Sequence, residues 1–502
     1  MTIIGGEIVM KLMRTENVTE HPFDVAKWMA EESKDRGIKK PFIEDYSYEK
    51  KKQFKELCKI VKESLDIIID VSSEASSGTN SEWLERQHQA IIGDKVAIEY
   101  FLAEIEKVLR TKNITSKDFP SFFNSLSEAI FHEIWGLSVL AKWERYPESE
   151  ACCIRGTQLW IDIDGQFVKQ EEEFESLTVV ERIKRAFVIR RPDSVINRES
   201  PELEIEREDG SRITMIQPPR SRENYIMIRR FIVNKYSLHD QASRGTIPQE
   251  DIPIFQALAR TMANMIVAGR VRSAKSTFMT TLIGERDDSF VGAVLEKHFE
   301  VALSKHFPNR LFFEIQAKEG DLHKAIPRLL RMEHDFVVVG EIRSLEIEAY
   351  LQSTERGERG SLSTFHLTDV EQVVEQLARL TLDEFPTRRF EVEVERIARN
   401  IDIIITMDTE RDRSKKRVVG VTEVIWDNQQ RRHYTQDLIR YSKLKDKYYY
   451  SSNISSRLLN LMAKEDLEET KNLLRLLKQR EQVSPMEKLQ DISLTNEGIA
   501  LV

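Results

Sequence analysis

The sequence predicts an α/β protein in which a parallel sheet follows a smaller α+β domain and a helical extension. Between about residues 253 and 440, short β-branched runs alternate with helical patterns, as they do in parallel sheets. Between about residues 121 and 245, shorter extended runs adjoin Asp-Gly turn signals. From about residue 46 to 109, apolar residues recur every three or four positions, which is typical of amphipathic helices.

The composition narrows the class of protein. A chain of 502 residues, 40% apolar and 32% charged, describes a soluble globular protein of roughly three domains. The net charge of −9 provides no basic field, so we do not expect direct nucleic-acid binding. Three cysteines are too few for a disulfide framework and fit a reducing cytosol. No run reaches the ~18 apolar residues of a membrane-spanning helix, and residues 1–12 make a poor signal peptide.

Changes in hydrophobic periodicity suggest four segments. We expect a helical N-terminal extension at residues 1–120, an α+β domain at 121–250, an α/β domain at 251–440 and a helical tail at 441–502. The tail is expected to consist mainly of one helix at about 455–479.

The two middle segments contain the recognisable strands. In the α+β domain we predict strands at 159–163 and 212–216, a helix at 178–187 and a linker at 237–252. In the α/β domain the short apolar runs predict buried parallel strands, at 266–268, 311–313, 336–339 and 403–406. The basic stretch 411–417 fits a solvated hairpin turn better than a nucleic-acid patch.

A nearly complete phosphate-binding loop follows the first of these parallel strands. From Gly269 the spacing is G-x-x-x-x-A-K-S, with a helical pattern after it. In such a loop the backbone N–H groups cradle phosphates, Lys275 reaches the β- and γ-phosphates, and the Ser276 hydroxyl ligates Mg²⁺. The motif therefore predicts ATP and Mg²⁺ as ligands. The alternative is an ordinary strand–turn–helix with an exposed lysine.

Ala274 stands where this loop usually has a second glycine. If the position requires a positive φ, a Cβ costs roughly 1–2 kcal/mol. If φ stays negative, the methyl group is tolerable. We therefore expect weakened rather than abolished nucleotide binding.

Two further motifs follow in order. A β-branched strand ends in Gly340-Glu341, so Glu341 would stand beside the loop, where it could hold Mg²⁺ through water or polarise the attacking water. Residues 357–366 predict a turn into a short strand that ends at His366, a candidate sensor of the γ-phosphate. Read singly, Glu341 could be a surface carboxylate and His366 a structural histidine.

With these three segments in order, the chain resembles the type II/type IV secretion-system ATPase superfamily over about residues 120–440. It looks closest to the branch that assembles Flp/tad-type pili and to conjugation motors. The family's G-E-x-R matches residues 340–343, and its G-S-L-[ST]-T-x-H matches residues 360–366. The preceding domain resembles the family at residues 134–140, Asp209-Gly210-Ser211-Arg212, Pro218-Pro219 and 228–231.

The resemblance implies a RecA-like P-loop ATPase domain joined to an N-terminal domain, and a ring of six subunits. It implies catalytic roles for Glu341 and Lys275, a histidine-box role for His366, and Mg²⁺ binding by Ser276 and Glu341. It also implies nucleotide binding by a set of loop residues and phosphate-facing arginines: Gly269, Ser273, Ala274, Lys275, Ser276, Thr277, Arg229, Arg212 and Arg331.

The sequence departs from the family pattern at three places. Ala274 replaces the loop glycine, and Glu358 replaces the first histidine of the histidine box. The acidic "Asp box" is expected at Phe313-Glu314-Ile315, with Glu314 as the catalytic acid and Ile315 where the family has aspartate.

The leading hypothesis is a Mg²⁺-dependent ATPase motor of a pilus-assembly, secretion or conjugative-transfer system. It would act from the cytoplasm at the inner face of the membrane, with a membrane platform protein as partner. One alternative is a catalytically weak nucleotide-binding or scaffold subunit of the same machinery, which the three departures favour. Another is a DNA-dependent RecA-like helicase, which the acidic charge balance disfavours.

Overall fold

The structure is a computed structural model, and it describes most of the chain in two compact units that divide between Arg145 and Tyr146. No helix in this part of the chain is long and apolar enough to cross a bilayer. The expected segment boundaries at 120/121, 250/251 and 440/441 stay predictions. Residues 1–12, Asp209-Gly210 and Phe231 lie outside the described residues, which are 48–75, 79–92, 94–188, 194–206, 211–230, 232, 235–317, 321–367, 369–410, 415–489, 493–495 and 498–500.

The first unit is helical, as predicted. Its core contains Phe54 and Val61 with Phe101 and Ile105, which recur at helical spacing and face Phe131. Ser125 caps one helix by accepting a hydrogen bond from the Glu128 N–H. The elements are α2 (Tyr48–Ala75), α3 (Thr79–Ile92), α4 (Lys95–Thr111), α5 (Leu126–Ile134) and η1 (Ser138–Arg145).

The second unit begins with a six-stranded antiparallel sheet in the order β3-β2-β1-β6-β5-β4. The predicted strands at 159–163 and 212–216 are confirmed, and Asp164 and Gly165 both adopt positive φ in the β2–β3 turn. The predicted helix at 178–187 is also confirmed. The elements are β1 (Ala151–Arg155), β2 (Gln158–Ile163), β3 (Gln166–Glu173), α6 (Leu177–Val188), β4 (Glu202–Glu206), β5 (Arg212–Ile216) and β6 (Tyr225–Arg229).

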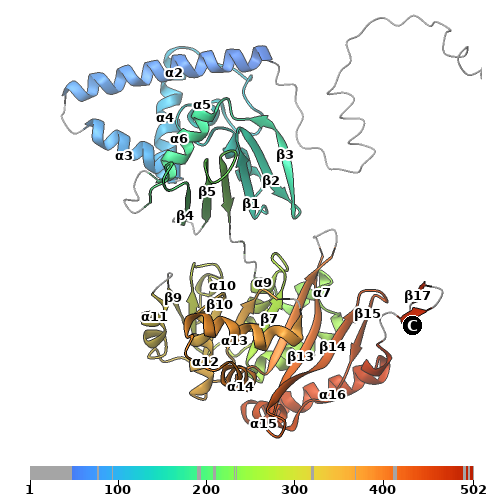
Figure 1. Ribbon diagram of the computed structural model, residues 1–502. Coiled ribbons are helices and arrows are strands. Elements are labelled where there is room, and N and C mark those ends of the chain that lie inside the picture. The colour runs from blue at the N-terminus through green and yellow to red at the C-terminus, as the bar shows by residue number, and fades with distance from the viewer. Residues whose placement is uncertain are drawn as a thin grey trace, which may run out of the picture. The chain divides into compact units, whose positions relative to one another are not determined.

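A nine-stranded sheet in the order β15-β14-β13-β12-β7-β11-β10-β8-β9 follows in the second unit, with helices packed against it (Figure 1). The six strands from β12 to β9 are parallel, which confirms the predicted α/β class and its four predicted strands. Prediction missed β8 and the antiparallel extension. The strands are β7 (Met265–Gly269), β8 (Gly292–Glu296), β9 (Phe312–Gln316), β10 (Phe336–Ile342), β11 (Leu362–Phe365), β12 (Ile403–Thr409), β13 (Lys416–Asp427), β14 (Arg432–Ser442) and β15 (Lys447–Tyr450).

Alternating residues of the parallel strands enter two separate cores, one on each face of the sheet. Val338 of β10 joins the core on the face covered by α8, α9, α15 and α16, whereas Val337 and Val339 join the core under α11 to α14. Each of these side chains is fully buried, which is worth roughly 1.5–3 kcal/mol per residue. The covering helices are α8 (Ile252–Arg260), α9 (Lys275–Gly284), α11 (Leu322–Leu329), α12 (Glu346–Glu355), α13 (Val373–Glu384), α14 (Phe390–Asn400), α15 (Ser456–Glu465) and α16 (Leu467–Val483).

Two predictions about connecting segments are wrong. Residues 237–252 are not a linker, because α7 (Leu238–Ser243) and η2 (Gln249–Asp251) form there and Ile247 is buried in the core. The tail helix is broken at Asp466, whose side chain caps α16 by accepting from the Glu469 N–H. The remaining short elements are α10 (Leu303–His306), η3 (Val370–Gln372), η4 (Met486–Lys488), β16 (Ser493–Thr495) and β17 (Gly498–Ala500).

The predicted hairpin at 411–417 is consistent with the pairing of β12 with β13, since Thr409 lies opposite Lys416. Residues 411–414 of that turn lie outside the described residues.

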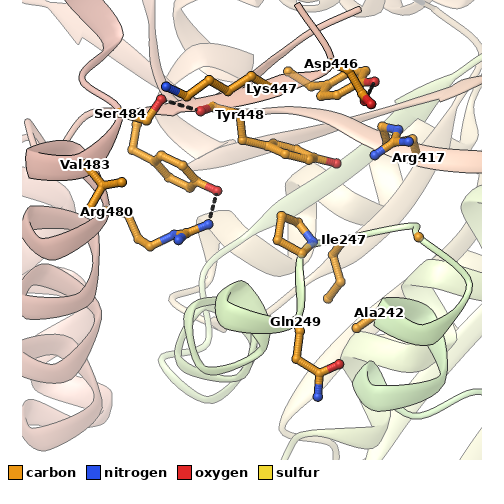
Figure 2. Close-up of a pocket in the computed structure, with 14 residues that line it drawn as sticks. Ala242, Ile247, Gln249, Arg417, Asp446, Lys447, Tyr448, Arg480, Val483 and Ser484 are labelled. Carbon is orange, nitrogen blue, oxygen red and sulfur yellow. Dashed lines mark hydrogen bonds between the residues drawn. The ribbon is translucent and has the colours of Figure 1, made fainter.

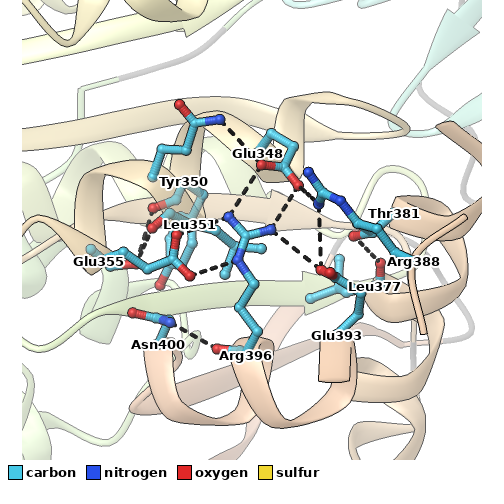
Figure 3. A network of polar contacts seen from close by, with 12 residues as sticks. Glu348, Tyr350, Leu351, Glu355, Leu377, Thr381, Arg388, Glu393, Arg396 and Asn400 are labelled. Carbon is cyan, nitrogen blue, oxygen red and sulfur yellow. Dashed lines mark hydrogen bonds and ion pairs between the residues drawn. The ribbon is translucent and has the colours of Figure 1, made fainter. Parts of the chain in front are cut away.

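A buried ion-pair network joins α12 to α14 (Figure 3). Glu348 of α12 is only 2% exposed, and both its oxygens accept from Arg396 of α14, at 2.7 and 3.2 Å. Arg388 also contacts Glu348, and Arg396 reaches Glu355 at 2.6 Å. Because α12 directly follows β10, this network holds the helix that extends from the centre of the sheet.

We expect Arg396→Ala to lower the free energy of unfolding by about 3 kcal/mol, because it removes a bidentate partner from a buried carboxylate. The matched control is Arg399→Ala on the same helix, whose pair with Glu395 is solvent-exposed and should cost less than about 1 kcal/mol. Urea denaturation followed by circular dichroism measures both. Equal, small losses for the two variants would contradict a stabilising role for the network.

Candidate functional site

The parallel pairing of four neighbouring strands brings the predicted motifs to one edge of the sheet. In the order β7-β11-β10-β8, the carboxyl ends are Gly269, Phe365, Ile342 and Glu296. The phosphate loop, His366, Glu341 and Glu296 therefore share one edge, the usual place for a ligand in an open α/β sheet.

The loop between β7 and α9 has the strained backbone of a phosphate cradle. Ala274 has φ 63° and ψ 30°, so the position requires the left-handed conformation that an alanine adopts at a cost of roughly 1–2 kcal/mol. Gly269 is required sterically, because a Cβ there would lie 2.3 Å from the Met407 carbonyl oxygen. Helix α9 begins at Lys275, so its N-terminal N–H groups face the same space.

Lys275 is buried and turned toward the loop and the sheet edge. Its Nζ donates to the Arg270 carbonyl at 2.9 Å and lies 3.1 Å from His366 Nδ1. Burial lowers the pKa of Lys275 to about 8, although the nearby Glu341 carboxylate opposes this shift. A bound anion such as phosphate would favour the protonated form of Lys275 and raise its pKa again.

Glu341 is held between His366 and Arg343. His366 Nε2 lies 2.5 Å from its Oε1, and Arg343 donates to its Oε2. Burial alone would raise the pKa of Glu341, but the hydrogen bonds from His366 and Arg343 outweigh it and lower the pKa to about 2. In a neutral imidazole, Nε2–H donates to Glu341 while Nδ1 accepts from Lys275, so His366 links the loop lysine to the carboxylate.

A third acidic residue, Glu296, stands at the same edge and was not predicted. Its Oε1 accepts from the Glu300 and Val301 N–H groups at 3.2 and 3.0 Å, whereas its buried Oε2 has no partner among the described residues. Burial raises the pKa of Glu296 to about 8. The close approach of this side chain to β10 requires Gly340, since a Cβ there would lie 2.8 Å from Glu296 Cγ.

Glu296, Glu341 and Ser276 line one small space of about 20 Å³, roughly the room that one water molecule needs. It adjoins the larger cleft, a cavity of about 520 Å³ lined by the loop, Glu341, His366 and Arg229. Ser273, Ala274, Ser276 and Thr277 also line that cleft, with the Ser273 hydroxyl bonded to the Arg270 carbonyl at 2.8 Å.

The structure does not bring Glu314 to this site. Glu314 lies on β9, the outermost strand, where its Oε1 accepts from the Ser304 N–H at 3.3 Å, and it lines neither cavity. The acid at this edge is instead Glu296 of β8, which is one strand closer to the loop than β9. An available signal was the apolar run 292–295 followed by Glu296 and Glu300.

The three predicted arginines have different surroundings. Arg229 lines the cleft, and Arg212 is buried with its Nη2 2.7 Å from Glu300, which lines both cavities. Arg331 is exposed after α11 and lines neither cavity. Glu358 accepts from His334 Nε2 at 2.8 Å and from the hydroxyl of Ser353 on α12, so it links the segment before β10 to the end of that helix.

The residues of the cleft fit a nucleoside triphosphate with Mg²⁺. The cradle could supply N–H donors and a lysine for phosphate, and Ser276 and Glu341 could supply oxygen ligands for Mg²⁺. No cluster of three or more His, Cys, Asp or Glu side chains that could hold a metal occurs in the described residues.

Comparison with known proteins identifies the family. Residues 180–473 match the family model described as "Type II/IV secretion system protein". The chain is 23% identical over 218 residues to a "Probable conjugal transfer protein TrbB" of Sinorhizobium fredii, which covers 42% of this chain and 64% of that relative's length.

Two solved structures are similar at lower identity. One is the VirB11 ATPase from the Brucella suis type IV secretion system, at 18% identity over 56% of this chain and 94% of that one, with a TM-score of 0.30. The other is the Legionella pneumophila ATPase DotB, at 16% identity over 68% of this chain and 86% of that one, with a TM-score of 0.39. Because the family match spans more than half of its residues, this chain belongs to the type II/type IV secretion system protein family.

Proposed function

We propose that this chain is the ATP-hydrolysing motor subunit of a type II or type IV secretion, pilus-assembly or conjugative-transfer system. The observation that carries the proposal is the convergence of the phosphate loop, Glu341, His366 and Glu296 at one sheet edge. The family match and the relatives named conjugal transfer proteins support it.

The residues of the cleft would divide the work of phosphoryl transfer. The loop N–H groups and Lys275 would bind the phosphates together with Arg229, which also lines the cleft, while Arg212 contacts Glu300 of the cleft lining. Ser276 and Glu341 would hold Mg²⁺, which when bound neutralises charge on the phosphate oxygens.

Glu296 is the best-placed proton acceptor. Its Oε2 is buried without a partner among the described residues and adjoins the water-sized space beside Ser276 and Glu341. In its ionised form Glu296 is the stronger base of the two carboxylates, because burial raises its pKa to about 8 whereas the pKa of Glu341 is about 2. His366 contacts both Lys275 and Glu341. When Lys275 turns to a bound phosphate, His366 would lose its contact with the lysine, and this change would reach Glu341 through the other ring nitrogen.

The family resemblance further supports a homohexameric ring that binds a membrane platform protein at the inner face of the cytoplasmic membrane. Catalysis at such a site is mainly positioning and charge stabilisation, so small displacements of the loop matter.

A second candidate, a nucleotide-binding or scaffold subunit with weak turnover, is favoured by one observation. Ala274 occupies the left-handed position of the loop, and the Lys275 side chain is engaged by Arg270 and His366 rather than extended into open space.

ATP turnover by the purified full chain tests the motor proposal. We expect Lys275→Ala, Glu341→Gln and Glu296→Gln each to lower kcat at least about 100-fold. The matched control is Glu314→Gln, which should turn over like the unmodified chain because Glu314 lies outside the cleft. Rates that do not differ among these proteins would contradict the motor proposal. Tight binding of a non-hydrolysable ATP analogue without turnover would support the second candidate.

Restoring a glycine in the loop is expected to improve binding. Ala274→Gly should remove about 1 kcal/mol of backbone strain, raise the melting temperature, and tighten the Kd for a non-hydrolysable ATP analogue up to about tenfold. The control is Ala257→Gly within α8, which should destabilise by at least about 1 kcal/mol because that backbone is helical. An Ala274→Gly protein that is less stable and binds no better would refute the strain argument.

The lowered pKa of Lys275 predicts a pH-dependent affinity. Below about pH 8 the lysine is protonated and binds phosphate, and as the pH rises through this value the free protein loses that charge. The Kd for the ATP analogue should therefore rise about tenfold per pH unit above about pH 8. Calorimetric titration between pH 7 and 9.5 measures this, and Lys275→Arg should flatten the profile. A flat profile in the unmodified chain would contradict it, and a rise that persists in Lys275→Arg would assign the titration to Glu296.

A further inference from the structure

A second cavity of about 440 Å³ opens on the C-terminal side of the second unit and shares no lining residue with the nucleotide cleft. Figure 2 shows its walls, with residues of the β14–β15 strands on one side and the 245–249 loop with α7 on the other. The end of α16 closes a third side through Arg480, Val483 and Ser484. Its volume falls in the range of small-ligand sites.

Three tyrosines form an aromatic wall along the cavity. The ring centroids of Tyr441 and Tyr448 lie 4.9 Å apart, and those of Tyr448 and Tyr450 lie 6.5 Å apart. Their hydroxyl groups donate to Asp446 at 2.5 Å, to the Val418 carbonyl at 2.9 Å and to Asp251 at 2.7 Å, respectively. The rings are therefore fixed before any ligand arrives, which reduces the ordering cost of binding.

Cationic side chains stand at both ends of this wall and at its rim. The Arg417 guanidinium lies 4.4 Å from the Tyr441 ring centroid, and that of Arg480 lies 4.6 Å from the Tyr450 centroid. Lys447 also lines the cavity and is exposed; its Nζ lies 5.5 Å from the ring centroid of Tyr449, which is outside the lining, and no ion pair of Lys447 with a carboxylate of the described residues is found.

The carboxylates that balance the two arginines are not part of the lining. Asp251, 2.8 Å from Arg480 Nε, is completely buried, and Glu410, 3.1 Å from Arg417 Nη2, lies outside the cavity wall. The one acid of the lining, Asp446, has its Oδ1 occupied by the Tyr441 hydroxyl. The cavity consequently presents positive groups and aromatic surface to a ligand.

We propose that this cavity binds a planar aromatic molecule that carries a phosphate, of the size of a nucleoside monophosphate. The ring would pack against the Tyr441–Tyr448 wall, and the phosphate would meet Arg417 and Lys447 through charge-assisted hydrogen bonds. An uncharged apolar ligand would leave these cations desolvated, which disfavours it. The proposal does not depend on ATP hydrolysis in the other cleft.

Calorimetric titration of the full chain with the Lys275→Ala change, which disables the phosphate loop, tests this second site. The probes are GMP and AMP, with guanosine and inorganic phosphate alone as the separate halves of the ligand. We expect one site with a Kd below about 1 mM for at least one monophosphate, and binding at least about tenfold weaker for either half. If Lys275→Ala does not fold by circular dichroism, Lys275→Gln, which keeps most of the side-chain volume and removes the charge, replaces it.

Substitutions on the wall locate the binding. Lys447→Glu should weaken monophosphate binding at least tenfold, whereas Lys443→Glu, an exposed lysine of the same turn outside the lining, should change it less than about twofold. Tyr441→Leu should weaken it and Tyr441→Phe should preserve it. Absence of binding by both monophosphates, or binding that Lys447→Glu and Tyr441→Leu leave unchanged, would overturn the proposal.

Discussion

The parallel pairing of β7, β11, β10 and β8 is the constraint on which the rest of the site depends. Parallel strands end at the same edge, so residues from four distant chain segments meet there without any long loop to position them. The register places Val339 beside Leu295 and Ser363, and Glu296, Glu341 and His366 follow one to three residues later, at the ends of their strands. Burial on both faces keeps this register, because a slip of one residue would exchange the two cores.

The electrostatics of the cleft follow from that geometry. Two carboxylates at one edge would repel each other if both were ionised, and the structure separates their pKa values by giving them different partners. Glu341 lies between His366 and Arg343, whereas Glu296 has only backbone donors and a buried oxygen. Lys275 carries the opposite charge on the loop, and its Nζ lies 3.1 Å from His366 Nδ1. A change in the protonation of Lys275 therefore affects His366 and, through it, Glu341.

The antiparallel strands β13, β14 and β15 supply residues to both cavities of the second unit. Neighbouring residues of β13 point to opposite sides, so Lys416 lines the nucleotide cleft while Arg417 lines the tyrosine-walled cavity. Helix α7 borders that cavity through Ala242, and its Gln241 donates to Thr281 of α9 at 2.9 Å. A continuous set of contacts therefore runs from the second cavity to the helix that begins at the phosphate loop.

The sequence by itself determined the local features of this protein. The β-branched runs, the Asp-Gly turn after Ile163 and the loop from Gly269 to Ser276 each depend on neighbouring residues, and Glu341 and His366 were recognisable from the strands that end beside them. Tertiary structure decided which acid joins them. Glu296 and Glu314 both lie on short apolar strands, and only the strand order places β8 beside β10 and leaves β9 at the margin. It also decided that Ala274 must adopt a positive φ, since that angle is set by where α9 must begin, not by the alanine itself.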